Sequence, residues 1–320
     1  MNFPIDFTPV HVALHHAANR YASGDSFRIF HGRGGCYEDL HWCAIDYFDG
    51  LWVATLYAPT NEETEQGLFD LLVAHMFATG AHDSTLLVQR RYLDGAPWQV
   101  IIGAMPEEGT AKRGNLQFAL NFNQQNLGFF LDIEPARKWL EQTASNKRVL
   151  NMFSYTCAFS VVAMAAGADS VVNIDMSRRS LDVGRKNHHI NKLDTQAVKF
   201  LPHNIFKSWG KLRKLGPYDV VIVDPPSFQK GSFVATKDYA KVVRKLTDLV
   251  EVGGHALLCL NSPEISFTAF HKEIETVLSE DVCAQEGKFE LEQKMAACED
   301  FAESSPDHGA LKILAYRRVA

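Results

Sequence analysis

The chain has 320 residues, of which 46% are hydrophobic and 22% charged, and its formal net charge is -6. This composition is typical of a globular protein with a buried core, so disorder is not expected. The length favours two domains. The N-terminus lacks the basic start and apolar core of a signal peptide, and no uncharged apolar stretch of about 18 residues occurs, so we expect a cytoplasmic protein.

The first third of the chain carries the acidic charge. Residues 1–114 contain 7 Lys and Arg against 14 Asp and Glu, a net charge of -7, whereas the remainder has a net charge of +1. Phosphate contacts require basic side chains. Any nucleic acid is therefore expected to bind mainly to the C-terminal part.

Between about residues 25 and 125, short apolar runs surround one helical stretch. The predicted strands are FRIF, LWVATLY, TLLVQRRY and WQVIIGA, and residues 62–80 predict a helix. Breaks in composition follow at 106–115 and 143–148. We predict a small α+β domain over residues 1–114, with a possible role in substrate or RNA recognition.

From residue 148 onward, strands and helices are predicted in strict alternation. The predicted strands are RVLNMF, SVVNID, AVKFLP, YDVVIVD and HALLCLN, and the predicted helices are 159–167, 178–191, 206–215 and 237–250. Continuous apolar strands separated by amphipathic helices predict a parallel sheet covered on both faces. Residues 115–320 should thus form a doubly wound, mostly parallel α/β sheet, which binds its ligand beyond the carboxyl ends of the strands.

The first two strands of this sheet end in residues that suit a nucleoside ligand. Residues 151–157 read N-M-F-S-Y-T-C where a dinucleotide enzyme would have G-x-G-x-x-G, which favours a ligand without phosphates, such as S-adenosylmethionine. Asp175 ends the second strand, near the spacing at which an acidic residue binds ribose hydroxyls. The alternative is that Asp175 caps the next helix, since Ser177 follows.

The fourth strand ends in Asp224-Pro225-Pro226-Ser227-Phe228. Consecutive prolines remove two backbone donors and fix the path of the chain, which leaves the carbonyls at the strand end free. These carbonyls and Asp224 form a group of acceptors suited to an amino group, and Phe228 offers a face on which a flat base can stack. The alternative is a proline strand stop without a functional role.

Taken together, these motifs resemble the class I S-adenosylmethionine-dependent methyltransferases of 23S ribosomal RNA that carry a D-P-P-x-F motif. The resemblance covers about residue 115 to the end and includes GFFLDIEPAR, RVLNMFSYT, VVNIDMSRRSLDVGRKNHHIN, YDVVIVDPPSF, VGGHALLCLNS and LKILAYRRV. The segment from FRIFHGRGG to about residue 105 looks like a diverged copy of the small domain that precedes the catalytic one in this family. The resemblance implies S-adenosyl-L-methionine as cofactor, S-adenosyl-L-homocysteine as product and RNA as substrate.

The resemblance also implies which residues contact the cofactor. Phe130 and Arg137 would line its methionine end, where an arginine suits the carboxylate. Asp175 would bind the ribose, Met176 the adenine ring, and Asn204 the adenine amino group through its side-chain carbonyl. The other implied contacts are Asn151, Phe153, Ser154, Tyr155, Thr156, Ser177, Ile205 and Asp224.

Two positions depart from the family pattern. Cys157-Ala158 replaces a Gly-Gly or Gly-Ser pair, which should narrow the loop beneath the cofactor. Asn261 ends the fifth strand, where members that methylate carbon 5 of cytosine place the thiolate that this carbon needs. Cys259 lies two residues earlier, and we interpret it as a buried, space-filling residue and not as a nucleophile. Direct in-line transfer to a nitrogen is therefore predicted. The predicted catalytic residues are Asp224, Pro225, Pro226, Phe228 and Asn261.

Two groups of basic residues bear on RNA binding. Arg178, Arg179, Arg185 and Lys186 are interpreted as a solvated helix face, with an RNA-facing edge as the alternative. A second group follows D-P-P-S-F and adjoins the proposed substrate pocket, so phosphate contact is expected there. Its members are Lys230, Lys237, Lys241, Arg244 and Lys245.

No metal site is predicted. The six cysteines are scattered and include no C-x-x-C pair. His11, His15 and His16 have a helical spacing, but no cluster of carboxylates or cysteines accompanies them.

Three functions remain open from the sequence. The first is a methyltransferase for a base of ribosomal RNA, without a membrane partner and either monomeric or homodimeric. The second is a methyltransferase for a small molecule or a protein, which fits the acidic first third of the chain. The third is a cofactor-binding protein without catalysis, which Cys157-Ala158 would favour if it blocked the methyl donor.

Overall fold

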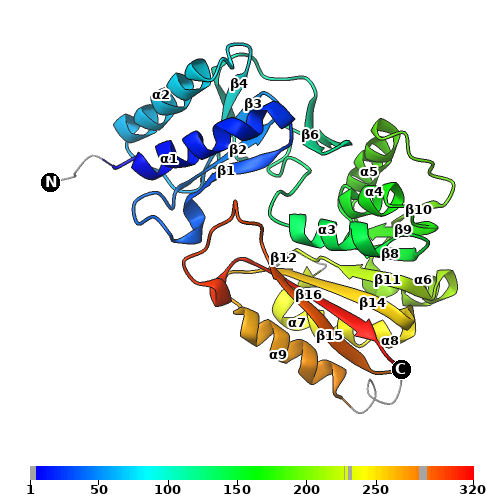
Figure 1. Cartoon of the computed structure of the whole chain (residues 1–320). Coiled ribbons are helices and arrows are strands. Elements are labelled where there is room, and N and C mark those ends of the chain that lie inside the picture. Colours follow the sequence, from blue (N-terminus) through cyan, green and yellow to red (C-terminus); the bar gives the residue numbers. More distant parts are fainter. Residues whose placement is uncertain (1–4, 227, 230–232, 281–286) are drawn as a thin grey trace. The chain divides into compact units, whose positions relative to one another are not determined.

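A computed structural model describes residues 5–226, 228–229, 233–280 and 287–320, and the chain divides into two compact units (Figure 1). Unit 1 comprises Met1–Leu131 and Cys298–Ser304, and unit 2 comprises Asp132–Ala297 and Ser305–Ala320. The first division therefore falls after Leu131, later than the domain boundary predicted at residue 114. Within the described residues, no helix is both long and apolar enough to span a membrane.

Unit 1 has a five-stranded sheet in the order β1-β2-β3-β4-β5. The strands are β1 (Phe27–His31), β2 (Cys43–Phe48), β3 (Leu51–Leu56), β4 (Thr85–Arg90) and β5 (Trp98–Ile102). Helix α2 (Glu62–Ala78) connects the parallel pair β3 and β4, and the other neighbouring strands are antiparallel. Helix α1 (Thr8–Ala17) and the hairpin of β6 (Gly109–Arg113) and β7 (Leu116–Leu120) complete the described α+β architecture, which confirms the predicted fold class.

Strand β2 was not predicted, although each of its positions is buried. Its pattern is broken by Asp46, whose carboxylate accepts two hydrogen bonds from Arg28 on β1, at 2.8 and 3.0 Å. A bidentate pair of this kind satisfies a charge that would otherwise be costly to bury.

The segment Cys298–Ser304 packs with unit 1 although it is distant in sequence. Arg20 donates two hydrogen bonds to Asp300, at 2.6 and 2.9 Å, and the guanidinium of Arg28 lies 4.3 Å from the ring centroid of Phe301. A Cβ at Gly34 would lie 1.8 Å from the carbonyl oxygen of Ala302, so only glycine allows this close approach.

Unit 2 has a seven-stranded sheet in the order β10-β9-β8-β11-β14-β16-β15. The strands are β8 (Arg148–Met152), β9 (Ser170–Asp175), β10 (Val198–Pro202), β11 (Tyr218–Val223), β14 (Val250–Asn261), β15 (Phe289–Ala296) and β16 (Leu311–Arg318). The first five strands in spatial order are parallel, and β16 runs antiparallel to both of its neighbours. The mostly parallel sheet is therefore confirmed.

Helices cover both faces of this sheet (Figure 1). The helices are α3 (Glu134–Thr143), α4 (Ala158–Ala165), α5 (Arg178–Ile190), α6 (Trp209–Leu215), α7 (Ala235–Val243), α8 (Leu246–Leu249) and α9 (Phe267–Leu278). Side chains of α6 to α9 form one buried core with Leu150, Ile174 and Val221 of the strands. Helices α4 and α5 lie on the opposite face (Figure 1).

The predicted helix over 237–250 is two helices, α7 and α8, and β14 begins at Val250 instead of His255. After β11 in the chain, the short strands β12 (Phe228–Gln229) and β13 (Phe233–Val234) pair antiparallel. Because β8, β9, β11 and β14 are parallel, the residues that follow them gather at one edge of the sheet.

Candidate active site

The loop after β8 has an unusual backbone. Phe153, Tyr155 and Cys157 have φ values of 56°, 45° and 61°, in the left-handed region that side chains other than glycine rarely adopt. Each such residue costs of the order of 1 kcal/mol or more, so the surrounding structure must hold the loop in place.

Hydrogen bonds between this loop and other described elements hold it in place. The N–H of Ser154 donates to the carbonyl of Ile174 at 3.2 Å, and the N–H of Tyr155 donates to Asp175 Oδ2 at 2.9 Å. Asn187 of α5 donates from Nδ2 to the carbonyl of Thr156 at 2.9 Å. The loop is thus tied to β9 and α5 by contacts within the protein.

The side chain of Cys157 packs against α5 at Gly184, where the absence of a side chain leaves space for it. The thiol is fully buried, and a Cβ at Gly184 would lie only 2.4 Å from Cys157 Sγ. Burial raises the pKa of this thiol. The side chain that replaces the family's glycine is therefore packed against α5, and Gly184 provides the space for it.

Asp175, at the end of β9, is held by two backbone donors. Its Oδ2 accepts the N–H of Tyr155, and its Oδ1 accepts the N–H of Ser177 at 2.8 Å. Burial raises the pKa of Asp175, while these two hydrogen bonds lower it. Ser177, and not Asp175, is the N-cap of α5, since its hydroxyl accepts the N–H of Ser180 at 3.1 Å. Each carboxylate oxygen keeps a further lone pair, which can accept a hydrogen bond from a ribose hydroxyl group, as predicted for this residue.

Met176 and Asn204 lie together beyond β9 and β10. Asn204 Nδ2 lies 3.6 Å from the sulfur of Met176, and Met176 is 43% exposed. Asn204 Oδ1 already accepts the N–H of Phe206 at 2.9 Å, so one lone pair remains for the predicted adenine contact. The side chain of Ile205 is buried in the core, so the predicted cofactor contact of this residue would have to be made by its backbone.

A chain of buried side chains lies under the loop. Asn151 Nδ2 donates to Asn173 Oδ1, and Asn173 Nδ2 donates to Ser160 Oγ, both at 2.9 Å. Ser160 bonds to His188 Nε2 at 2.9 Å, and His188 Nδ1 donates to the carbonyl of Gly184. Burial lowers the pKa of His188, which favours the neutral ring that this pattern requires.

Asn151 has one unused acceptor. Its Oδ1 is buried and accepts no hydrogen bond from any residue that the structure describes. Such an atom is costly unless a bound molecule or water satisfies it. Together with the fixed loop and the acceptors of Asp175, it fits a polar nucleoside ligand at this edge of the sheet.

The second half of the site surrounds Asp224, the residue after β11. Asp224 is partly exposed, and its pKa is raised to about 7. Burial is the main cause, the negative charge of Asp132 contributes, and the positive charge of Arg137 opposes both. Arg137 itself is buried on α3, 3.7 Å from the carboxylate of Glu134. The structure therefore brings the predicted residues Asp224 and Arg137 together with Asp132, which was not predicted.

Asn261 and Cys259 lie on β14, next to β11. Asn261 is exposed and donates from Nδ2 to Asp132 Oδ2 at 3.3 Å. Cys259 is fully buried, and burial together with the charges of Asp224 and Asp132 raises its pKa well above the ordinary value. A thiol in this position is held protonated, in agreement with the interpretation of Cys259 as a space-filling residue.

Tyr239 of α7 joins the ends of β11 and β14. Its buried hydroxyl donates to the carbonyl of Cys259 at 2.9 Å and lies 3.5 Å from the carbonyl of Val223. This contact holds the strand ends that carry Asp224 and Asn261. The sequence shows Tyr239 only as an aromatic residue within a predicted helix, and nothing in that pattern indicates the hydroxyl's partners.

The remaining predicted site residues have different surroundings. Phe130 is 44% exposed and belongs to unit 1, Pro225 is buried and Pro226 is exposed. The side chain of Phe228 and the residues Ser227 and Lys230 lie outside the described part of the chain. Within the second basic group, Arg244 forms a bidentate pair with Glu280, at 2.6 Å for both hydrogen bonds.

Comparison with known proteins decides the family. The model of the S-adenosylmethionine-dependent methyltransferases matches residues 27–317. The chain belongs to this family. Its cofactor is accordingly S-adenosylmethionine, as the missing phosphate loop predicted.

Among curated relatives, the chain is similar to ribosomal RNA large subunit methyltransferase K/L of Hahella chejuensis. The two are 31% identical over 229 residues, which is 68% of this chain and 32% of the relative. It is also 34% identical to ribosomal RNA large subunit methyltransferase I of Shigella dysenteriae, over 78% of this chain and 64% of the relative. The chain thus spans about a third of the length of the first relative.

Among solved structures, a proposed methyltransferase in complex with SAH has a TM-score of 0.83 and 22% identity, over 100% of this chain and 83% of that one. At this level of identity, the likeness supports the fold.

Proposed function

We propose that this methyltransferase modifies a nitrogen of a base in ribosomal RNA, by direct in-line transfer and without a covalent enzyme intermediate. The observation that carries the proposal is Asp224 at the end of β11, a carboxylate whose pKa is raised to about 7 by burial and by the charge of Asp132, which itself accepts a hydrogen bond from Asn261. The names of the curated relatives support ribosomal RNA as the substrate. We place the reaction in the cytoplasm.

The cofactor side of the proposed site is formed by the edge at β8, β9 and β10. Asp175 would accept hydrogen bonds from the ribose, Met176 would contact the adenine, and Asn204 Oδ1 would accept from its amino group. Arg137 would hold the carboxylate of the methionine end through paired hydrogen bonds. The bound cofactor supplies a methyl group attached to a positively charged sulfur.

The reaction requires a nucleophilic nitrogen and an acceptor for its proton. As the nitrogen forms its bond to the methyl carbon, the carbon–sulfur bond breaks and the nitrogen becomes more acidic. Asp224 would take the released proton, because a carboxylate with a pKa near neutrality is ionised in part at pH 7 and still basic enough to accept it. Asn261, oriented by Asp132, would hold the target group in line.

This chemistry does not need a thiolate. Carbon 5 of cytosine requires covalent activation, whereas a ring or exocyclic nitrogen has its own lone pair. Cys259 is fully buried and protonated, which disfavours carbon methylation. Asn261 stands at the exposed strand end, where a nucleophile would have to be.

Binding to RNA separates this proposal from a small-molecule or protein substrate. A transcript of large-subunit ribosomal RNA should bind, with an affinity that falls steeply as salt increases, because phosphate contacts release counterions. Label from tritiated S-adenosylmethionine should enter the RNA. If the protein bound neither ribosomal RNA nor any other RNA at low salt, the substrate assignment would be wrong.

Calorimetry with S-adenosylmethionine tests the alternative of a protein that lacks catalysis. We expect tight binding because the side chain of Cys157 packs against Gly184 of α5 and is buried there. Binding without any methyl transfer to RNA, protein or extract would favour that alternative.

A further inference from the structure

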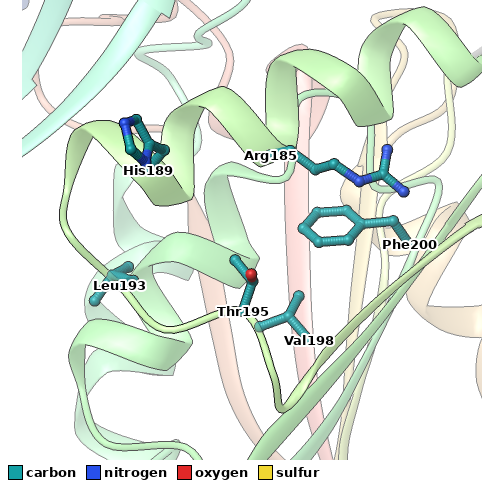
Figure 2. A pocket seen from close by; sticks show the side chains of 6 residues that line it. All are labelled: Arg185, His189, Leu193, Thr195, Val198 and Phe200. Carbon is teal, nitrogen blue, oxygen red and sulfur yellow. The ribbon is translucent and has the colours of Figure 1, made fainter.

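A groove lies at the edge of the unit 2 sheet, outside the proposed active site. It has a volume of about 390 Å³, within the range of ligand-binding pockets. Its walls come from the later part of α5, the following loop and β10, which is an edge strand (Figure 2). The lining residues are Arg185, His189, Leu193, Thr195, Val198 and Phe200. Of these, Val198 alone is buried, so the groove belongs to the surface.

Phe200 offers an ordered stacking surface in this groove. The guanidinium of Arg185 lies over its ring, with the Cζ atom 4.6 Å from the ring centroid (Figure 2). His188 contacts the ring edge-on, with centroids 5.4 Å apart and an angle of 87° between the planes. Asp182 also fixes Arg185, through a hydrogen bond of 2.7 Å. An aromatic ring and a guanidinium are the two side-chain groups on which unpaired bases stack.

The groove lies in a basic part of an acidic protein. Residues 178–199 contain six Lys and Arg against two Asp, a net charge of +4, whereas the whole chain has -6. All six basic side chains are exposed. This local excess is the electrostatic signature of contact with phosphates and is hard to explain for a neutral or cationic partner.

Helix α5 connects the groove with the proposed active site. Arg178, Arg185 and His189 are separated by seven and four residues, so they lie along one stripe of the helix. The stripe is about 16 Å long at 1.5 Å per residue. It begins next to Ser177, at the predicted cofactor edge, and ends at the groove. Arg178 forms no ion pair with any residue that the structure describes, and its charge is available to a ligand.

We propose that this groove is a second RNA contact: an unpaired base of the substrate stacks on Phe200 and Arg185, while its backbone phosphates follow the basic stripe of α5. This inference rests on the proposed RNA substrate. It assigns to α5 and β10 the RNA-facing edge that the sequence left open against a solvated helix face. The contact holds a nucleotide that is not methylated, at a distance from the target base.

The test measures RNA binding of the full chain with Arg185→Gln and Phe200→Leu. The probe is a transcript of large-subunit ribosomal RNA, titrated at several salt concentrations. Arg185→Gln should reduce the salt slope by about one unit, because Arg185 also belongs to the basic stripe and its loss removes one positive charge from the path of the phosphates. Phe200→Leu should weaken binding by about five- to 150-fold without changing the slope, because it removes stacking and no charge. Affinity for S-adenosylmethionine should remain that of the wild type in both variants.

Matched control variants come from elsewhere in the same unit. Arg213→Gln removes an arginine from α6, on the opposite face of the sheet. The side chain of Arg213 is 55% exposed, against 50% for Arg185, and each arginine lies near an aspartate. Phe289→Leu removes a half-buried phenylalanine from β15, the opposite edge strand. Both control variants should bind RNA like the wild type.

The outcomes distinguish this inference from the proposed function. If the wild type binds RNA and the groove variants bind as tightly as the control variants, the second contact does not exist and the groove serves another partner. If the wild type itself does not bind RNA, the proposed function fails first. Ultraviolet crosslinking should, in addition, attach RNA to the peptide that contains Phe200, and its absence from the crosslinked peptides would overturn the stacking arrangement.

Discussion

Asp175 and Asp224 both follow parallel strands of the same sheet, yet their surroundings differ. Burial raises the pKa of Asp175, and the hydrogen bonds that it accepts from the N–H groups of Ser177 and Tyr155 oppose this effect without cancelling it. Asp224 faces the negative charge of Asp132, which acts with burial and raises its pKa to about 7. Hydrogen-bond donors stabilise a carboxylate, whereas a second carboxylate makes it a better base.

This difference suits the two carboxylates to two roles at one edge of the sheet, the binding of a ligand and the transfer of a proton. A carboxylate held by backbone donors suits the binding of neutral hydroxyl groups, since the donors hold its oxygens in position. A carboxylate that titrates near neutrality suits the transfer of a proton. The predictions below test this division, from the largest expected effect to the smallest.

The largest effect is expected for Asp224→Asn. This change keeps the shape of the side chain but removes the proton acceptor, so turnover should fall by about 10²- to 10⁴-fold. The variant should melt like the wild type, because the side chain lies at a partly exposed strand end. Asp169→Asn, at the amino end of β9, is the matched control variant and should retain full activity. Turnover above about a tenth of wild type would remove Asp224 from the proton transfer.

Asp175→Ala should act on the cofactor and not on the proton. We expect the affinity for S-adenosylmethionine to fall by about 1.5 to 3 kcal/mol, because hydrogen bonds to a charged group are lost. Isothermal titration calorimetry measures this directly. Asp194→Ala is a close control variant, since Asp194 accepts the N–H of Gln196 at 2.9 Å, two residues on, as Asp175 does with Ser177. Equal cofactor affinities in the two variants would place Asp175 outside the cofactor site.

The pH dependence of turnover should show the raised pKa of Asp224. Below about pH 7 the carboxyl is protonated and cannot accept a proton, so kcat should fall about tenfold per pH unit and level off above it. Asp132→Asn removes a negative charge that raises this pKa. The decrease of kcat on the acid side of the pH profile should therefore move to lower pH. A decrease that stays in place or moves upward in that variant would contradict the coupling of the two carboxylates.

Gly184→Ala tests how the cofactor loop is held. The new Cβ would lie 2.4 Å from Cys157 Sγ, so the loop or α5 must shift, at a cost of about 1 to 3 kcal/mol of stability. Affinity for S-adenosylmethionine should fall as well. The double variant Cys157→Gly with Gly184→Ala should recover much of both losses, since glycine adopts the φ of 61° without strain. Additive losses in the double variant would show that the two residues are not coupled.

The smallest effect is expected for Cys259→Ser. The thiol is buried and protonated and takes no part in the proposed reaction, so the variant should keep substantial activity. RNA that contains 5-fluorocytosine should form no covalent adduct with the wild type. A folded but inactive serine variant, or a trapped adduct, would make Cys259 a nucleophile and overturn nitrogen methylation.

The elements that surround the site were predictable because their signals are local. Strands β8, β9 and β11 are short, mostly apolar runs, and helices α5 and α6 have a polar face, whereas α4 is largely apolar and buried. Strand β2 was missed because Asp46 interrupts its apolar pattern, and the pairing that permits this involves Arg28 on another strand. The return of Cys298–Ser304 to unit 1 depends on contacts far apart in sequence, which no local pattern contains.

The same limit applies to the site residues. Asp175 and Asp224 could be proposed from the sequence because each follows a predicted strand, where ligands bind in this fold. Asp132 and Tyr239 were missed because they act across the sequence, Asp132 on Asn261 and Tyr239 on the carbonyl of Cys259. The sequence also could not predict that Cys157 packs into the space left by the missing side chain of Gly184. It showed the cysteine only as a departure from the family pattern, and the structure shows where its side chain lies.

Nucleoside analysis of ribosomal RNA from a strain that lacks the gene is the most direct test of nitrogen methylation of an RNA base. Mass spectrometry should find one methylated nucleoside missing from the large-subunit RNA, with the methyl group on a nitrogen. The modification should return with the wild-type gene and not with Asp224→Asn. Unchanged ribosomal RNA, or the loss of 5-methylcytosine in place of an N-methyl nucleoside, would contradict the proposed function.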